Sequence, residues 1–282
     1  MLSRKYFVPL QKIYRRMRWR KILIIIFLLL PFMAEAETKK DSLFDWSASA
    51  TLTSNYIWRG LYVGGPSLHM DATVSYAGVF ANMWWNVGAT DWAFSGFNPE
   101  VDLTIGFSRW GFTVLYLHMF YFDKYSDGTP SRFFDFRNHL KGGTTGEWRV
   151  SYRVSDRIPL SCLVACRTFG RDGYEMNGEL KRAYSTYIEL GYDFDLTHDW
   201  LLAARFGFTP AKSMYTGYQG DFAVTLVGLN LQKHWDLGQV AVTSFANLML
   251  QPWQVTKDNL ILPIEQAGSQ KLNLAVGCNI SI

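Results

Sequence analysis

The chain is poor in cysteine, with only Cys162, Cys166 and Cys278 among its 282 residues. Cys162 and Cys166 are four positions apart on what reads as one strand, so their Cα atoms would be ~13 Å apart, too far for a disulfide. No second pair of ligands accompanies them at the spacing of a metal site. The sequence therefore argues against a disulfide framework, and we expect neither a metal nor another cofactor.

Long apolar runs are missing after the first 36 residues, which excludes a helical membrane protein. The one such run, Ile22–Met33, follows the basic stretch RRMRWRK and precedes the small residues of AEA at 34–36. This order is typical of a signal peptide, and the run is too short to cross a bilayer comfortably. We expect residues 1–36 to be a signal peptide, with Met17 as an alternative start, and residues 37–282 to form the mature domain.

The mature chain also lacks an excess of positive charge. The full sequence has 28 basic and 24 acidic residues and a formal net charge of +4. Residues 1–36 hold eight of the basic residues and one of the acidic residues, so the remaining chain has a net charge near −3. The basic character belongs to the predicted signal peptide, and we expect no nucleic-acid partner.

What the mature chain does contain is a regular alternation of apolar and polar residues. Even positions from Phe44 to Trp58 are mostly apolar and odd positions mostly polar, and residues 67–76, 79–87 and 101–108 repeat the pattern. A period of two indicates a strand with one apolar face. The sequence predicts about twelve strands, the others near residues 115–119, 148–154, 160–166, 188–194, 200–208, 223–231, 240–250 and 272–282.

The links between these strands alternate in length. Those after every second strand are short, and the others are mostly long, the longest covering residues 123–143 and 251–270. Only the link at residues 60–65 breaks this rule, and we interpret it as a brief extracellular turn. Such alternation places all turns at one end of the sheet, as in an up-and-down barrel, whereas a Greek-key sandwich would scatter its long connections.

The predicted fold is therefore all-β: a single up-and-down antiparallel transmembrane β-barrel of about 12 strands. The polar face is rich in Ser, Thr, Asn and Gly and poor in the Lys and Glu that cover soluble surfaces. Large aromatic residues lie near the strand ends of the apolar face, as they do where a barrel meets lipid headgroups. A secreted sandwich or soluble barrel is the alternative, but the alternating strand that ends at Ile282 argues against it.

Strand alternation also assigns the charged residues that should line the lumen. We predict a pore lined by residues of both signs, with arginines concentrated on one half of the wall and isolated acids on the other. Such a split either makes a field across a narrow channel that favours small charged solutes, or lets the charges pair and plug it. The predicted pore-lining residues are Arg59, Asp71, Asp102, Arg149, Arg153, Arg167, Glu189 and Arg205, with Asp45, Glu147 and Asp193 nearby.

The long segment at residues 123–143 has two interpretations. It could fold inward and narrow the pore, or it could be an ordinary surface loop, which is the usual place of a long loop.

No catalytic constellation is apparent. Ser67, His69 and Asp71 share one face of a strand, but neighbours on such a face lie ~7 Å apart, which should put short side chains beyond hydrogen-bonding reach. His118 is expected to face the lumen together with Tyr116. Since no nucleophile, base and orienting acid come together, we expect the protein not to be an enzyme.

The stretch SNYIWRGLYVGGPSLHMDATVSYAGVFANMWWNV, residues 54–87, resembles the opening of the TorF-type porins of Gram-negative bacteria. YIELGYDF, residues 187–194, is similar to a later strand of that family. The resemblance implies an outer-membrane barrel with a porin role, but no substrate and no site residues. The positions that carry it are Ser54, Tyr56, Arg59, Gly60, Pro66, Tyr76, Gly78, Trp85 and Asn86.

The sequence thus predicts an outer-membrane porin-like channel for passive diffusion of small hydrophilic, charged solutes. The alternatives are a non-conducting barrel that acts as anchor, receptor or structural protein, and then a lipid-modifying enzyme. The expected partners are outer-membrane lipid and small solutes, and oligomerisation stays open.

Overall fold

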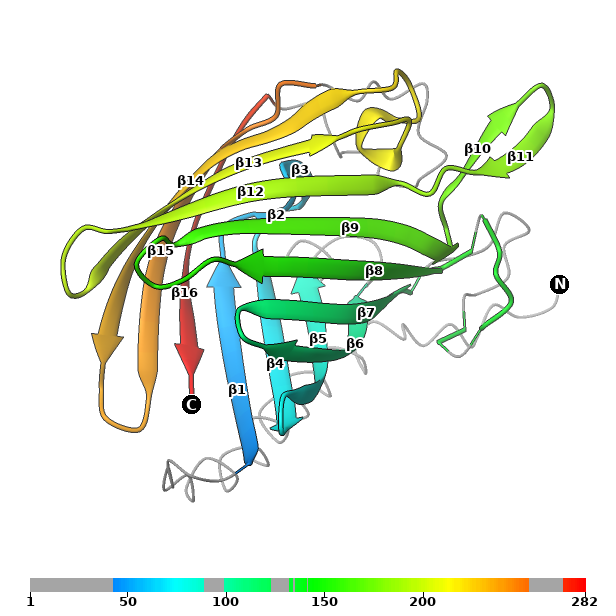
Figure 1. Ribbon diagram of the computed structural model, residues 1–282. Helices are drawn as coiled ribbons and strands as arrows, with labels where there is room; N and C mark the ends of the chain where they lie inside the picture. The colour runs from blue at the N-terminus through cyan, green and yellow to red at the C-terminus, as the bar shows by residue number, and fades with distance from the viewer. Residues whose placement is uncertain (1–42, 89–98, 123–131, 134, 141, 254–270) are drawn as a thin grey trace, which may run out of the picture. The chain divides into compact units, whose positions relative to one another are not determined.

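The computed structural model describes residues 43–88, 99–122, 132–133, 135–140, 142–253 and 271–282 (Figure 1). The predicted signal peptide, residues 123–131 of the long segment and residues 254–270 lie outside the described residues. Among the residues described, no helix is long and apolar enough to span a membrane.

Twelve strands form one closed antiparallel barrel, which confirms the predicted fold (Figure 1). Each strand pairs with its neighbour along the chain, and β1 closes the barrel by pairing with both β4 and β16. The barrel strands are β1 (Phe44–Thr53), β4 (Ser67–Tyr76), β5 (Val79–Gly88), β6 (Glu100–Arg109), β7 (Phe112–Tyr121), β8 (Thr144–Arg153), β9 (Leu160–Gly170), β12 (Thr186–Asp195), β13 (Trp200–Thr209), β14 (Ala223–Asp236), β15 (Ala241–Leu250) and β16 (Leu272–Ser281).

The apolar face of the sheet points outward, as predicted. Val74, Ile105 and Trp148 belong to one row of paired residues that runs across β4 to β8, and all three are exposed. The residues of opposite parity, such as Asp71 and Asp102, therefore face the interior. A soluble barrel would show the reverse arrangement.

The two ends of the barrel differ in their connections. At one end, called the turn end, short links at residues 77–78, 110–111, 154–159, 196–199 and 237–240 join consecutive strands. The first barrel strand also begins at this end, where Phe44 pairs with Tyr76. The last strand ends there, where Ser281 pairs with Ala241. The opposite end, called the loop end, carries the longer connections. The predicted separation of turns and loops is thus confirmed.

Two predictions about the first strand are wrong. β1 ends at Thr53, not near Trp58, and residues 60–65 are not an extracellular turn. The chain instead forms a separate hairpin of β2 (Tyr56–Trp58) and β3 (Leu61–Gly64), called here the inner hairpin. It leaves the wall where Ser54 N donates to Val276 O at 2.8 Å and Asn55 Nδ2 donates to Leu274 O at 2.6 Å.

The inner hairpin lies inside the loop end of the barrel. Leu61 packs in a buried cluster with Ala165 of β9 and Tyr187 of β12, although β1 and β4, which flank the hairpin in sequence, lie elsewhere on the wall. The same cluster contains Met214 and Tyr215 of the short 3-10 helix η2 (Met214–Thr216). The connection between β13 and β14 therefore also folds inward, and this buried cluster lies within the barrel.

The described part of the long segment after β7 lies against the outer face. Phe133 contacts Phe120 with ring centroids 5.1 Å apart, and Phe136 contacts His118 at 5.9 Å. His118 and Tyr116 pair with Leu103 and Ile105 in the outward row. The expectation that His118 and Tyr116 face the lumen is therefore wrong, because the parity of β7 turns both of them outward.

A second small hairpin, β10 (Gly173–Met176) and β11 (Glu179–Arg182), connects β9 to β12 at the loop end. Most of its residues from Glu175 to Lys181 are exposed, and in Figure 1 it extends away from the barrel strands. The two inserted hairpins thus have opposite surroundings, one inside the barrel and one in solvent.

Candidate channel interior

Arg59 occupies the turn of the inner hairpin and makes the most buried ion pair of the described interior. Its Nη2 lies 2.8 Å from Oε1 of Glu147 on β8, and its Nη1 lies 2.8 Å from Oε2 of the same carboxylate. The Nη1 also donates to the hydroxyl of Tyr215 at 2.5 Å. This two-pronged geometry matches the planar guanidinium fork to both carboxylate oxygens.

The surroundings of Arg59 keep it charged. Burial lowers the pKa of the guanidinium, but Tyr215 and Glu147 together outweigh burial and raise the pKa above its ordinary value. The guanidinium carbon also lies 4.6 Å from the ring centroids of both Trp58 and Tyr187, within the range of cation–π attraction. The hairpin tip is therefore fixed by electrostatics to β8, to η2 and to β12.

Gly60 holds the tip of the inner hairpin against β14 and β16. Its φ of +85° and that of Arg59, +53°, form the two-residue turn of the hairpin. A Cβ at Gly60 would lie only 2.4 Å from the backbone O of Thr225 on β14, so only glycine permits this approach. Asn273 Nδ2 of β16 donates to Gly60 O at 3.3 Å. The hairpin thus crosses the interior between β8 and the β14–β16 wall.

The base of the inner hairpin is held near β4 to β6. Tyr56 Oη donates to Glu100 Oε2 at 3.0 Å, and the Tyr56 ring packs against His69 and Trp84 with centroids 5.0 and 5.7 Å apart. These contacts join the hairpin to the acidic half of the wall.

The expectation that Ser67 and His69 are out of hydrogen-bonding reach is wrong. Ser67 Oγ lies 3.0 Å from His69 Nε2, because the imidazole is long enough to bend back along the strand. Asp71 instead accepts from Asn82 Nδ2 at 2.8 Å, and no carboxylate of the described chain hydrogen-bonds His69. Without a third group to orient the histidine, the pair does not complete a catalytic triad.

A second ion-pair network occupies the turn end. Arg153 Nη1 donates to Asp193 Oδ2 at 2.6 Å, and Arg205 Nη2 lies 2.8 Å from Asp193 Oδ1. The Nε of Arg205 is 3.8 Å from Glu189 Oε1, and Tyr187 Oη donates to Glu189 Oε2 at 2.6 Å. Since Tyr187 also contacts Arg59, charged and polar groups run continuously from the inner hairpin to the turn end.

The predicted pore-lining residues all lie on the interior side of the barrel, but they differ in their strands and in their ion-pair partners. Arg149 bonds Glu147 Oε1 through Nε at 2.5 Å, so this buried carboxylate serves both Arg59 and Arg149. Asp71 and Asp102 lie on β4 and β6 rather than on the arginine-bearing strands β8, β9 and β13, although Asp102 interacts electrostatically with Arg149 and Arg167. The split of charge is therefore present, but most arginines pair with acids on their own half of the wall.

Sequence reasoning missed the aromatic and glycine partners. Tyr215 belongs to a loop without alternation, and only the aromatic-rich MYTGY at residues 214–218 signals that this loop is buried. Tyr56 and Trp58 keep the apolar period of β1, so nothing marks them as members of a separate hairpin. The Arg59-Gly60 pair between Trp58 and Leu61 is the local signal of a turn with a buried charge.

No group of three or more His, Cys, Asp or Glu residues within the described chain is placed to hold a metal ion. Cys162, Cys166 and Cys278 are free and lie on the outward parity of β9 and β16.

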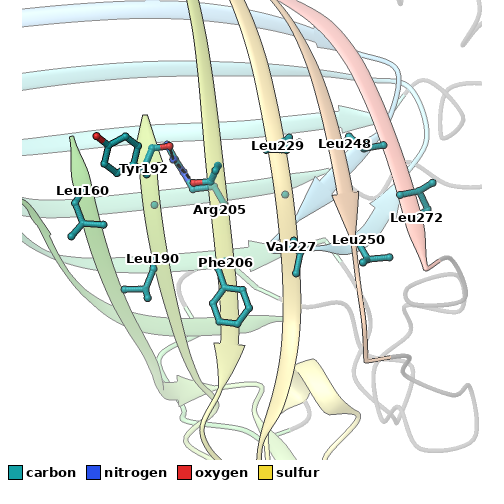
Figure 2. A pocket seen from close by; sticks show the side chains of 13 residues that line it. Leu160, Leu190, Tyr192, Arg205, Phe206, Val227, Leu229, Leu248, Leu250 and Leu272 are labelled. Carbon is teal, nitrogen blue, oxygen red and sulfur yellow. Dashed lines mark hydrogen bonds between the residues drawn. The ribbon is translucent and has the colours of Figure 1, made fainter. Parts of the chain in front are cut away.

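An apolar hollow of about 620 Å³ lies on the outer face over β9 and β12 to β16, as Figure 2 shows. Its walls include Leu190, Phe206, Val227 and Leu229, all of outward parity. Arg205 sits behind this wall, where its Nη1 donates to the backbone O of Tyr192 at 3.5 Å. The hollow is thus part of the apolar exterior, and Arg205 both lines it and belongs to the ion-pair network of the interior.

No protein-family model matches the sequence, and no curated protein matches it. The resemblance to TorF-type porins therefore stays a prediction. Among solved structures, the chain is similar to a NanC porin at 11% identity, over 84% of this chain and 99% of that one, with a TM-score of 0.45. It is also similar to a Pseudomonas aeruginosa FadL homologue at 8% identity, over 84% of this chain and 73% of that one, with a TM-score of 0.34. Both likenesses are remote, so the function has to be inferred from the residues of this chain.

Proposed function

We propose that the protein is an outer-membrane porin-like channel of a Gram-negative bacterium, through which small hydrophilic, charged solutes diffuse. The observation that carries the proposal is the direction of the sheet: exposed leucines, valines and aromatics outside, ionised residues inside. A closed barrel satisfies every strand hydrogen bond internally, which lipid requires. The predicted signal peptide is consistent with export through the inner membrane.

The turn-end interior supports charge selectivity. Arg153 and Arg205 keep 42% and 30% of their side chains exposed while they share Asp193. Water and mobile ions can therefore reach these groups, whose field acts on a permeating solute. The two arginines face two carboxylates, Asp193 and Glu189, so this stretch presents charges of both signs to the solute.

A non-conducting barrel is the second candidate, and the inner hairpin favours it. A barrel of twelve strands is only moderately wide, and the hairpin together with η2 fills part of its loop end. A protein fixed in this state would act as an anchor, receptor or structural element.

Planar-bilayer recording separates the two candidates. We expect the wild-type protein to conduct weakly, and a variant in which residues 56–64 are replaced by a short Gly-Ser link to conduct several times more. A control variant with the exposed residues 175–180 of the β10–β11 hairpin shortened should conduct like the wild type. If neither the wild-type protein nor the variant without the inner hairpin conducts, the channel proposal is wrong and the non-conducting barrel stands.

A further inference from the structure

Within the part of the chain that the structure describes, Arg167 of β9 is a buried cation without an ion pair. The residue is only 2% exposed. Among the described residues no carboxylate lies within ion-pair distance of its guanidinium, and its Nε has no hydrogen-bond partner. Its Nη1 reaches the backbone O of Arg171 at 3.5 Å, at the outer limit of a hydrogen bond. Removing a charge from water without compensation is unfavourable, so a site of this kind favours an anion.

Two carboxylates whose charges act on Arg167, Glu147 and Asp172, already have other hydrogen-bond partners. Arg167 lies directly opposite Glu147 in the β8–β9 register, yet both oxygens of Glu147 bind Arg59, and Arg149 takes a second bond to Oε1. Asp172 accepts hydrogen bonds from the backbone N and the hydroxyl of Ser185 at 2.8 and 2.5 Å. Among the described residues, neither carboxylate therefore forms an ion pair with Arg167, whose guanidinium lies over the same indole as that of Arg59.

The inner hairpin covers this guanidinium. The Cζ atom of Arg167 lies 5.3 Å from the ring of Trp58, and the Cζ of Arg59 lies 4.6 Å from the same ring. Two guanidinium groups thus share one indole, which attracts cations but carries no negative charge. An anion that reaches Arg167 from the lumen therefore has to displace Trp58.

We propose that Arg167 is a binding site for a small oxyanion, a carboxylate or a phosphate group, that enters from the lumen. The proposal rests on the proposed channel function, since the solute arrives along the half-exposed arginines of the turn end. A planar guanidinium binds two oxygens of either group through parallel hydrogen bonds. The site deepens the channel proposal by naming the solute class as anionic and the contact as Arg167.

Thermal unfolding of the full-length barrel in detergent, followed by tryptophan fluorescence, tests the site. Sodium phosphate and sodium acetate are titrated in separate series at fixed ionic strength, which is balanced with sodium chloride. We expect one or both to raise the Tm of the wild-type protein in a saturable way, because a ligand that binds only the folded state stabilises it. The series that saturates at the lower concentration identifies phosphate or carboxylate as the preferred group.

The variant Arg167→Gln should abolish the saturable rise, whereas Arg109→Gln, which removes an exposed arginine at the turn end, should retain it. If Arg167→Gln does not fold, Arg167→Lys keeps a cation and should shift the half-saturating concentration several-fold upward. No saturable rise in the wild-type protein with either anion, or an equal rise in the wild type and the Arg167 variants, would overturn the proposal.

The variant Arg167→Met gives a second readout that needs no ligand. Since the cation is buried and unpaired, its removal should raise the Tm in buffer without phosphate or acetate, while Arg59→Met should lower it by leaving Glu147 short of a partner. A fall in Tm for Arg167→Met would contradict the premise. Because neither readout requires conduction, a protein that binds the anion but never conducts would refute the channel and leave the site standing.

Discussion

Two ion pairs of the interior have similar lengths but different surroundings. At the loop end, the side chains of Arg59 and Glu147 are 7% and 0% exposed at a distance of 2.8 Å. At the turn end, those of Arg153 and Asp193 are 42% and 13% exposed at 2.6 Å. Breaking a buried pair leaves a charge without water or partner, whereas an exposed pair is replaced by solvent. We infer that the loop end uses its charges to hold the inner hairpin and the turn end presents its charges to solute.

The largest expected effect comes from breaking the buried pair. Glu147→Gln should lower the free energy of unfolding by about 3–5 kcal/mol, because Arg59 and Arg149 lose the carboxylate they share. Urea unfolding in detergent measures the change. The matched control Glu189→Gln, at a position whose side chain is 24% exposed beside Arg205, should cost about 1 kcal/mol or less. Equal losses of unfolding free energy for Glu147→Gln and Glu189→Gln would contradict the proposed difference between the loop end and the turn end.

A comparison of the two inserted hairpins should give the next largest effect. Gly60→Ala and Gly178→Ala both place a side chain at a positive φ, +85° and +78°, which costs roughly 1–2 kcal/mol. Gly60→Ala must also displace Thr225, whose backbone O lies 2.4 Å from the new Cβ. A Cβ added at Gly178 has no atom within 4 Å. Gly60→Ala should therefore destabilise the protein more and raise its conductance. A variant pair with equal unfolding midpoints would show that the inner hairpin is not fixed to β14.

At the turn end, Asp193→Asn should change selectivity more than stability. The substitution leaves Arg153 and Arg205 without their shared carboxylate, so the reversal potential in a salt gradient should move toward anion selectivity. The free energy of unfolding should fall by about 1 kcal/mol or less, since Arg153 and Arg205 are partly solvated. An unchanged reversal potential would mean that the permeating ions do not pass these groups.

The smallest expected effect is a pH dependence at Asp172, in the connection between β9 and β10. Burial raises the pKa of this carboxyl above its ordinary value, although Arg167 and the bonds from Ser185 oppose the shift. The folded state therefore favours the protonated form, and the corresponding stability is present below about pH 3.9, the unfolded value, and is lost as the pH rises through the folded pKa.

Comparison of Tm against pH for the wild type and Asp172→Asn measures this contribution. The wild type should lose stability relative to the variant as the pH rises through that window. A difference in Tm that stays constant with pH would contradict the raised pKa.

The sequence was sufficient for the barrel and for its orientation. Alternation over β4, β5 and β6 defines the outward face locally, since each strand carries its own period of two. The same alternation placed Arg149, Arg153 and Arg205 inside, because parity needs no knowledge of the partner strand.

The sequence was insufficient where position depends on distant segments. Tyr56 and Trp58 continue the apolar period of β1, but the chain turns inward after Thr53, and only contacts with β8, β14 and β16 reveal where its tip lies. Which acid pairs with which arginine likewise depends on the reach of the inner hairpin, because Arg59 takes the carboxylate that the register places opposite Arg167.

The central claim is that the apolar face of the sheet contacts hydrocarbon and the polar face encloses water. Val150 and Ser151 are adjacent on β8 and have opposite parity. In a protein without its native cysteines, reconstituted in vesicles, single cysteines at these positions are compared for reaction with a charged and a lipid-soluble thiol reagent. We predict that only the lipid-soluble reagent modifies Val150→Cys and that the charged reagent modifies Ser151→Cys. The reverse pattern would contradict the account.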